Sequence, residues 1–318
     1  MSSLKYYSEK DFPSYLPKLS QLYDDLFEGG TGFRSLLTQK VAFPLSLDEK
    51  LVKLLCQTIE FIHNASLLHD DLVDRSQLRR GKTAAWLKYT PEYAVLAGDY
   101  LLARVMTNLS AYGNIKLVQL TSQTIAELLE GEWIQDSLVG DFEITFDQLT
   151  QVHSLKTGSL FRWCLLAPWV ADESGDEEIH NLMCELGTTL GLLFQRSDDL
   201  LDYNIRNQEN KAILGDIKSG YLNSFGAFFC QGVDSETRQS LRKIESLEQI
   251  YRIIGEKKFQ ERLQEFDQLN IELIQLYRHK LERLEAKLNG QATGLVANLK
   301  GLPELLYWRD QAPQTDKA

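Results

Sequence analysis

Residues 60–86 have the sequence EFIHNASLLHDDLVDRSQLRRGKTAAW, in which three aspartates follow an apolar stretch. Apolar residues recur there at the three-to-four-residue spacing of a helix, which predicts an amphipathic helix over 50–74. Asp70 and Asp74 are four positions apart, so they share one face of that helix. Like charges at this spacing destabilise a helix by about 0.2–0.5 kcal/mol per pair. The stretch therefore predicts a helical carboxylate face that a cation stabilises.

A second stretch, GLLFQRSDDLLDY at 191–203, repeats the D-D-x-x-D pattern with Asp198, Asp199 and Asp202. Carboxylate oxygens without histidine or cysteine suit Mg²⁺, which keeps several waters and is usually shared with substrate phosphates. Two such faces on facing helices would hold Mg²⁺ and a diphosphate. The alternative interpretation is a pair of acidic helix faces exposed to solvent.

Basic residues near the clusters favour the diphosphate interpretation, because such a site needs cations as well as metal ions. Directly after the first cluster come Arg75, Arg79, Arg80 and Lys82. Further candidates along the chain are Lys156, Lys211 and Lys218. Each of these residues alone is typical of a solvated surface. Beside a D-D-x-x-D helix they indicate an anion held between metal and guanidinium.

The rest of the chain has the same helical pattern. Apolar residues keep helical spacing through 92–112, 115–139, 145–171, 177–207 and 236–290. No fixed-period repeat, low-complexity tract or proline-rich linker divides these segments. We therefore predict an all-α fold, a single large helical bundle in one domain over 1–318.

Composition narrows the classes of function. The 318 residues include 34 lysines and arginines and 45 acidic residues, which give a net charge of −11. Such a surface repels phosphate backbones, which argues against a nucleic-acid partner. No uncharged apolar run approaches the roughly 18 residues that span a bilayer, and the first residues match neither a signal nor a transit peptide. The four cysteines form no C-x-x-C pair, so we expect reduced thiols and a cytoplasmic protein.

Taken together, the motifs resemble those of the trans-isoprenyl diphosphate synthases, the polyprenyl synthetase family, of medium- or long-chain type. Residues 60–86 are similar to the family's first aspartate-rich motif with its Arg-Arg-Gly, and 191–203 to the second, Gly-x-x-Phe-Gln-x-x-Asp-Asp-x-x-Asp. Between them, in family order, come AGDYLLARV (97–105), EGEWIQ (130–135) and KTGSLF (156–161). The resemblance covers a motif-bearing core of 25–230, ahead of C-terminal helices over 236–310. It implies the isoprenoid synthase fold, in which helices surround a deep central cavity.

The same resemblance implies a Mg²⁺-dependent prenyltransferase of isoprenoid biosynthesis. Its reaction would condense isopentenyl diphosphate with an allylic prenyl diphosphate to give a longer trans-polyprenyl diphosphate. Mg²⁺ and cationic side chains would stabilise the leaving diphosphate, while apolar walls would shield the allylic cation from water. The resemblance further implies about three Mg²⁺ ions per active site with diphosphate bound. It also implies a homodimer and a peripheral membrane contact for product release.

Residue roles follow from the resemblance as well. The metal-binding residues would be Asp70, Asp71, Asp74 and Asp198, with Asp199 and Asp202 acting more through water. The allylic diphosphate would be held by Arg79, Lys156 and Lys211. Isopentenyl diphosphate would be held by Arg34, His63 and Arg80. The developing allylic cation would be stabilised by Thr157 and Gln195.

The chain departs from the family pattern at two lysines. GGTGFRS at 29–35 places Thr31 where the family has a lysine for isopentenyl diphosphate, and a later family lysine is Tyr221 here. The Thr-x-Pro beyond it is replaced by Asn223-Ser224-Phe225. Because these changes weaken the isopentenyl diphosphate half of the site, we predict a high Michaelis constant for that substrate. Steady-state kinetics with a low micromolar constant would contradict this prediction.

The resemblance implies that product length depends on the residues one helical turn before Asp70, which would line the tunnel into which the prenyl tail grows. Short-chain members of the family carry bulky aromatics there, whereas this chain has Ala65 and Ser66. Small side chains leave the tunnel open, so its floor would be set by deeper residues such as Ile62, Leu102 or Met106. We predict a product longer than farnesyl, of about the C25–C50 class.

Three alternative interpretations remain open. Glu60–His63 and Glu177–His180 are the two Glu-x-x-His motifs that a di-iron helix bundle needs, but such a centre leaves both aspartate clusters unexplained. A class I terpene cyclase shares the fold and the first motif, although its second metal motif is typically of an Asn/Ser/Glu type. A non-catalytic subunit of a heteromeric synthase generally loses its aspartates, and here all six remain.

Overall fold

The computed structural model of the chain describes residues 11–19, 21–22, 32–79, 81–172, 175–203, 213–292 and 294–308. These residues fall into two compact units. Unit 1 holds the described residues up to 125 together with 163–180 and 292–295, and unit 2 holds those in 126–162, in 181–291 and from 296 onward. The single domain over 1–318 stays a prediction.

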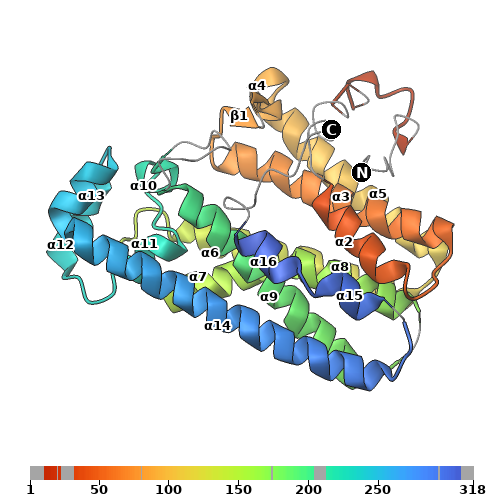
Figure 1. The fold of residues 1–318 in the computed structure, drawn as a ribbon. Coiled ribbons are helices and arrows are strands. Elements are labelled where there is room, and N and C mark those ends of the chain that lie inside the picture. Colours follow the sequence, from red (N-terminus) through yellow and green to blue (C-terminus); the bar gives the residue numbers. More distant parts are fainter. Residues whose placement is uncertain are drawn as a thin grey trace, which may run out of the picture. The chain divides into compact units, whose positions relative to one another are not determined.

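Helices make up nearly all of the regular structure in the described residues, which confirms the predicted all-α fold (Figure 1). The two strands found there, β1 (Leu78–Arg79) and β2 (Lys82–Thr83), form one short antiparallel hairpin. The helices are α2 (Phe33–Ala42), α3 (Glu49–Val73), α4 (Ala85–Lys88), α5 (Pro91–Tyr112), α6 (Ile115–Ser137), α7 (Phe146–His153), the π-helix η2 (Ser154–Gly158), α8 (Ser159–Ala171), α9 (Glu177–Leu201), α10 (Gly215–Lys218), α11 (Ser224–Phe229), α12 (Ser235–Ser240), the 3-10 helix η3 (Leu241–Lys243), α13 (Leu247–Ile254), α14 (Glu256–Leu288), α15 (Leu295–Leu299) and α16 (Leu302–Tyr307). None of the helices in the described part of the chain combines the length and the apolar character that crossing a membrane requires.

Three of the predicted helical segments closely match observed helices. Segments 50–74, 92–112 and 115–139 are α3, α5 and α6, with ends shifted by at most two residues. Segment 177–207 is helical as α9 up to Leu201, and residues 204–212 lie outside the described part of the chain. Apolar periodicity is a local property, so it locates a long helix well even without its neighbours.

Two predicted segments are divided in ways that periodicity does not reveal. Segment 145–171 is helical throughout, but the π-helix η2 separates α7 from α8. Segment 236–290 is divided among α12, η3, α13 and α14, and Gly255 ends α13 with a φ of 95°. Glycine reaches this conformation without steric cost, so it can end one helix and begin another.

Helix α3 carries the first aspartate cluster, and its sequence explains where it begins and how it packs. Asp48 caps the helix, because its side chain accepts a hydrogen bond from the backbone N–H of Lys50 at 2.8 Å. Apolar residues at helical spacing bury one face, among them Leu55 and Ile59. Within unit 1, α2 and α5 both pack against α3 (Figure 1). The first aspartate cluster therefore lies at the end of a helix that two neighbouring helices hold in place.

An aromatic cluster in unit 2 surrounds the short helix α11. Phe225 and Phe229 of α11 and Phe266 of α14 are fully buried. The ring of Phe225 lies 5.4 Å from that of Phe229 and 5.3 Å from that of Phe266, in the edge-on arrangement that aromatic rings prefer. This packing holds α11, which begins at Ser224, in place.

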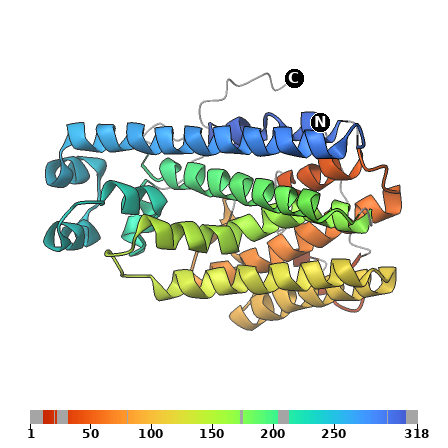
Figure 2. The ribbon, with the colours of Figure 1, turned by 90° about the horizontal axis from the view of Figure 1, so that it is seen from below.

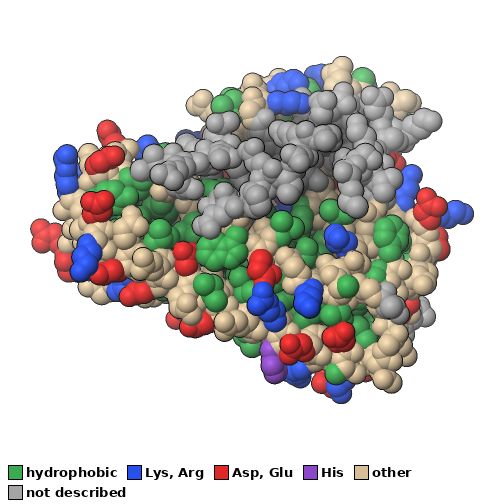
Figure 3. All heavy atoms as spheres, in the orientation of Figure 1, with side chains coloured by type: hydrophobic (Ala, Val, Ile, Leu, Met, Phe, Trp, Pro, Cys, Tyr) green, Lys and Arg blue, Asp and Glu red, His purple; other side chains and the backbone are tan. Residues whose placement is uncertain are grey.

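Helix α14, with 33 residues, runs along α9 in unit 2 (Figures 1 and 2). Arg196 of α9 donates to Asn270 of α14 at 3.0 Å, and Lys280 of α14 pairs with Glu185 of α9 at 3.1 Å. Acidic and basic side chains are interspersed along the side of α14 that Figure 3 shows. Mixed charge of this kind is typical of a solvent-exposed helix face.

Candidate active site

The first aspartate cluster lies in unit 1, at the C-terminal end of α3. Asp70 and Asp71 occupy the last turn, and Asp74 follows it, with its backbone N–H donating to the carbonyl of Asp70 at 2.8 Å. Asp71 is buried, Asp70 is half-buried and Asp74 is exposed. The C-terminal end of a helix carries partial negative charge, so three carboxylates there are repelled by it and by each other. A cation at this end of the helix would stabilise all three.

Arg79 is a cation that the fold itself brings to this cluster. Its Nε donates to Asp71 Oδ1 at 2.9 Å, and its Nη2 makes a second, closer contact with the same oxygen. Burial alone would lower the pKa of Arg79, but the hydrogen bond to Asp71 and the charges of Asp71, Asp70 and Asp74 outweigh burial and raise that pKa. One guanidinium therefore interacts with all three carboxylates.

The β1–β2 hairpin holds Arg79 in this position. Arg79 lies opposite Lys82 in the antiparallel register, and Gly81 in the turn has a φ of 76°, which glycine adopts without strain. Trp86 Nε1 donates to the carbonyl of Ser76 at 2.8 Å and so ties the hairpin to the end of α3. A strand of two residues is too short to leave a period-two pattern, so the sequence did not predict this hairpin.

The structure brings together two of the residues predicted to hold isopentenyl diphosphate. Arg34 Nη1, at the start of α2, lies 3.1 Å from His63 Nε2 on α3. Glu60, one turn before His63, accepts a hydrogen bond from the backbone N–H of Ser35 at 3.2 Å, which fixes the start of α2 beside α3. The third predicted residue, Arg80, lies outside the described residues.

The two positions predicted to control product length lie on α3, one turn before the cluster. Ala65 is fully buried, and Ser66 is half-buried with its hydroxyl donating to the carbonyl three residues earlier at 2.8 Å. Of the deeper positions, Ile62 is buried on α3, while Leu102 and Met106 are half-buried on α5. All five positions lie on α3 or α5, and these two helices pack against each other within unit 1.

In unit 2, Lys156 and Thr157 lie in the π-helix η2 between α7 and α8. Such π-turns are rare and recur at functional sites. Two glycines let neighbouring helices approach η2 closely. A Cβ added at Gly191 of α9 would lie 2.6 Å from the Cα of the glycine that ends η2, and one added at Gly131 of α6 would lie 2.8 Å from the backbone nitrogen of Lys156. The glycines of two quoted motifs thus pack directly on the backbone of a third.

A chain of hydrogen bonds joins three predicted residues of unit 2. Thr157 Oγ1 donates to Gln195 Oε1 at 2.8 Å, and Gln195 Nε2 donates to Asp199 Oδ1 at 3.0 Å. Thr157 and Asp199 are buried, and Gln195 is half-buried. The chain connects the π-helix to the second aspartate cluster.

The three aspartates of the second cluster have different surroundings. Asp199 Oδ2 accepts from the backbone N–H of Ser224 at 2.9 Å and from its hydroxyl at 2.5 Å. Asp202 is 0% exposed and accepts from two backbone N–H groups at the start of α10, at 2.8 and 3.2 Å. Asp198 is half-buried. Protein donors thus satisfy the two buried carboxylates, an arrangement that suits action on a metal ion through water.

Lys156, predicted to hold the allylic diphosphate, forms an ion pair with Glu132 of α6. Glu132 belongs to EGEWIQ, so the ion pair joins two of the quoted motifs. Two further residues that the sequence analysis singled out, Lys211 and Thr31, lie outside the described residues.

Two more basic side chains lie near Asp199. His153 is buried with Nε2 3.9 Å from Asp199 Oδ2, and burial lowers the pKa of His153 although the charge of Asp199 opposes this shift. Arg196 is 5% exposed and donates to Asn270 at 3.0 Å and to Thr150 at 3.3 Å. Burial lowers the pKa of Arg196 to about 10, so its guanidinium is still charged at neutral pH. This buried positive charge stabilises the Asp199 carboxylate.

The sequence alone does not reveal that Asn223 and Ser224 contact Asp199, and it shows the two residues only as a departure from the family pattern. Asn223 is 0% exposed, and its Nδ2 donates to the carbonyl of Asp199 at 3.2 Å and to Asp216 Oδ2 at 2.8 Å. An asparagine and a serine directly before an apolar run are a signature of a helix start. That signature predicts α11, but not which aspartate the pair contacts.

Both clusters offer carboxylate oxygens, which are the ligands that Mg²⁺ prefers. Within the described residues, no group of three or more His, Cys, Asp or Glu side chains is arranged to hold a metal ion by itself. Mg²⁺ in proteins usually completes its coordination with water and with the phosphate oxygens of a substrate. The carboxylates fit an ion that is shared with a diphosphate, rather than one enclosed by protein ligands.

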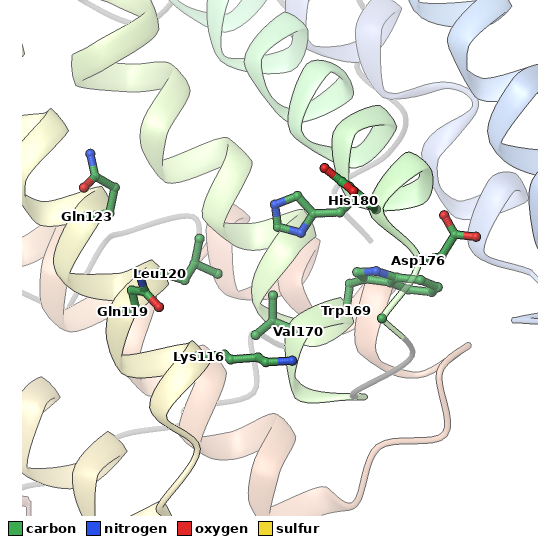
Figure 4. Close-up of a pocket in the computed structure, with 10 residues that line it drawn as sticks. Lys116, Gln119, Leu120, Gln123, Trp169, Val170, Asp176 and His180 are labelled. Carbon is green, nitrogen blue, oxygen red and sulfur yellow. The ribbon is translucent and has the colours of Figure 1, made fainter.

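The two Glu-x-x-His motifs of the di-iron alternative have different surroundings in unit 1. Glu177 and His180 line a pocket of about 520 Å³ between α6, α8 and the start of α9 (Figure 4). Glu60 accepts from the backbone of Ser35, and His63 lies against Arg34. Among the residues that the structure describes, these four side chains form no common group that could hold a metal ion.

Known proteins resemble this chain in both sequence and fold. The family model for polyprenyl synthetase matches residues 16–257. A decaprenyl-diphosphate synthase from Dictyostelium discoideum is 40% identical over 168 residues, which are 52% of this chain and 36% of the relative. An octaprenyl diphosphate synthase from Escherichia coli (strain K12) is 32% identical over 188 residues, 59% of this chain and 58% of the relative. The chain thus spans about half the length of the curated relatives it matches, or less. A decaprenyl diphosphate synthase from Rhodobacter capsulatus shares the fold, with a TM-score of 0.80 at 24% identity over 95% of this chain and 93% of that one.

Proposed function

Since the chain belongs to the polyprenyl synthetase family, we propose that it is a Mg²⁺-dependent prenyltransferase. It condenses isopentenyl diphosphate with an allylic prenyl diphosphate to give a longer trans-polyprenyl diphosphate. The observation that carries this proposal is the contact of Arg79 with Asp71 in the carboxylate cluster at the end of α3. A guanidinium beside clustered carboxylates suits a diphosphate that is held by metal ions on one side and by a cation on the other.

In this proposal both aspartate clusters bind Mg²⁺, about three ions per active site. The ligands are Asp70, Asp71, Asp74 and Asp198, with Asp199 and Asp202 acting more through water. When bound, the ions neutralise the negative charge that develops on the diphosphate as it leaves. The allylic diphosphate also contacts Arg79, Lys156 and Lys211.

Isopentenyl diphosphate is held by Arg34, His63 and Arg80. The 3.1 Å separation of Arg34 and His63 lets both side chains reach one diphosphate. Thr157 and Gln195 stabilise the allylic cation, because the amide oxygen of Gln195 carries partial negative charge in a partly buried site. Thr31 and Tyr221 stand where the family has lysines, so we still expect a high Michaelis constant for isopentenyl diphosphate.

We propose a product longer than farnesyl, of about the C25–C50 class. Ala65 and Ser66 are small where bulky residues would close the tunnel. The relatives named for octaprenyl and decaprenyl products support this class. The homodimer and the peripheral membrane contact belong to the same proposal.

The test is incubation with Mg²⁺, isopentenyl diphosphate and allylic primers of several lengths, followed by sizing of the products. We expect the wild-type protein to extend a primer. Asp70→Ala and Asp198→Ala should each lower the rate by about 100-fold or more, because each removes a carboxylate that would hold the Mg²⁺ that offsets the charge of the leaving diphosphate. Asp136→Ala removes an exposed aspartate from α6, and this matched control should leave the rate unchanged.

Other outcomes would favour the alternative functions. Release of a hydrocarbon would favour a terpene cyclase. Inactivity with every primer would favour a subunit of a heteromeric synthase, and stoichiometric iron would favour the di-iron bundle.

A further inference from the structure

The carboxylate of Asp199 is surrounded by hydrogen-bond donors within unit 2. Its Oδ1 accepts from Gln195 Nε2 at 3.0 Å, and its Oδ2 accepts from the backbone N–H and the hydroxyl of Ser224 at 2.9 and 2.5 Å. Asp199 is 3% exposed and Ser224 is 1% exposed. An ionised carboxylate only accepts hydrogen bonds, so each group that contacts it must present a donor.

This requirement fixes the orientation of the Gln195 side chain. Gln195 must present its NH₂ group to Asp199, which places its Oε1 on the opposite side of the amide. Thr157 donates to that oxygen at 2.8 Å. Asp199 therefore sets the direction of the hydrogen bond that Thr157 of the π-helix donates to Gln195 of α9.

Asn223 holds Ser224 in place. It is fully buried, and its Oδ1 accepts from Tyr203 Oη at 3.1 Å and from the backbone N–H of Gly226 at 3.0 Å. The second of these bonds caps α11, the helix that Ser224 begins. Its Nδ2 donates to the carbonyl of Asp199 at 3.2 Å, so Asn223 also ties α11 to the end of α9.

We propose that Asn223 and Ser224 are positioning residues, which fix Gln195 through Asp199 so that its Oε1 can stabilise the allylic cation. This inference rests on the proposed function, in which Thr157 and Gln195 perform that stabilisation. The cation exists only near the transition state, so a misoriented Gln195 lowers kcat while leaving the binding of the allylic diphosphate nearly unchanged.

The kinetic test is Ser224→Ala, which removes the hydroxyl and leaves the backbone donor and the α11 cap in place. We expect kcat to fall about 10-fold while KM for the allylic diphosphate stays within about 2-fold. Ser224→Thr restores a hydroxyl and should recover most of kcat. Ser219→Ala is the matched control, because the Ser219 hydroxyl is exposed and donates to the carbonyl of Asp216 at 2.7 Å.

A second measurement follows Gln195 directly in the substrate-free protein. Its side-chain amide signal in a ¹⁵N–¹H NMR spectrum is assigned by its loss in Gln195→Glu. We expect the signal to move in Ser224→Ala and to stay in place in Ser219→Ala. If Ser224→Ala does not fold, Asn223→Asp takes its place, because aspartate keeps the acceptor for Gly226 and Tyr203 and loses the donors to Asp199 and Asp216.

The two measurements separate the positioning role from the proposed function. An unmoved Gln195 signal in Ser224→Ala, or in Asn223→Asp where that variant takes its place, would overturn the positioning role, whatever reaction the protein catalyses. A rise in KM for the allylic diphosphate in Ser224→Ala, with kcat unchanged, would overturn the positioning role as well. A Gln195 signal that moves in Ser224→Ala, together with a wild-type protein that extends no primer, would uphold the positioning role and reject the proposed function.

Discussion

Among single residues, the six motif aspartates have different surroundings. Asp71 is paired with Arg79, whereas Asp199 and Asp202 accept hydrogen bonds from the protein segments that begin α11 and α10. Clustered carboxylates repel one another, and each of these arrangements offsets that repulsion with a positive charge or with N–H and O–H donors. The motif therefore shows where the carboxylates lie in the sequence, and the folded surroundings decide which cation or donor each of them contacts.

Ala65 tests the prediction of product length. Ala65→Phe places a ring at a fully buried position one turn before Asp70, so we expect it to raise the floor of the tunnel and shorten the products. The measurement is the chain-length distribution of products made from one allylic primer. Ala103→Phe, on an exposed position of α5, should leave that distribution unchanged.

The outcome must be judged on a folded variant. If Ala65→Phe unfolds within about 5 °C of the wild-type Tm and still makes the same products, the tunnel does not pass this position. Ala65→Val, which adds less volume, provides an intermediate point in the series.

Among the elements, the π-helix η2 organises the part of the site that lies in unit 2. It carries Lys156 and Thr157, and its backbone is approached by Gly131 from α6 and Gly191 from α9. The backbones of α6 and α9 approach that of η2 at glycines, so no side chain lies at these contacts that could move to relieve a clash. The extra residue of a π-turn is thus held by packing on two sides, which fixes where Thr157 meets Gln195.

Gly191→Ala tests this packing. Its Cβ would lie 2.6 Å from backbone in η2, which cannot rotate away, so we expect the free energy of unfolding to fall by about 1–3 kcal/mol. Urea denaturation measures the change. Gly301→Ala is the matched control in unit 2, because a Cβ there meets nothing within 4 Å. Equal stability of the two variants would mean that α9 and η2 are not in close contact.

For the whole molecule, the net charge of −11 is compatible with a phosphate-bearing ligand. Part of that charge belongs to the six motif aspartates, and the proposed Mg²⁺ ions would offset it. A nucleic acid would have to approach the remaining acidic surface as a long polyanion. The charge therefore argues against nucleic acid, but not against a small diphosphate.

The proposed homodimer can be tested on the exposed apolar side chains of α6. In unit 2, Leu129, Trp133 and Ile134 are 43%, 80% and 37% exposed, and exposed apolar patches of this kind mark contact surfaces. We expect Trp133→Glu to shift the protein from dimer to monomer in analytical ultracentrifugation. Leu276→Glu changes a side chain of α14 that is 48% exposed, and it should leave the dimer intact. A wild-type monomer at every concentration would contradict the proposal.

Much of the fold could be predicted from sequence, because long amphipathic helices such as α3 and α5 follow from the local spacing of apolar residues. The candidate site could be predicted only in part. Arg34 and His63 were predicted to act together and do lie together. The partner of Asp199 could not be predicted, because nothing local to Ser224 indicates an aspartate 25 positions earlier in the chain.

The sequence by itself determined the helices, the two aspartate motifs and the kinds of charge available, since each of these depends on residues close together in the chain. Only the tertiary structure decided which donor meets which carboxylate. Asp71 meets Arg79 because a short hairpin turns the chain back, and Asp199 meets Ser224 because an aromatic core holds α11 in place. Such contacts depend on packing between distant segments, and packing is a property of the folded chain.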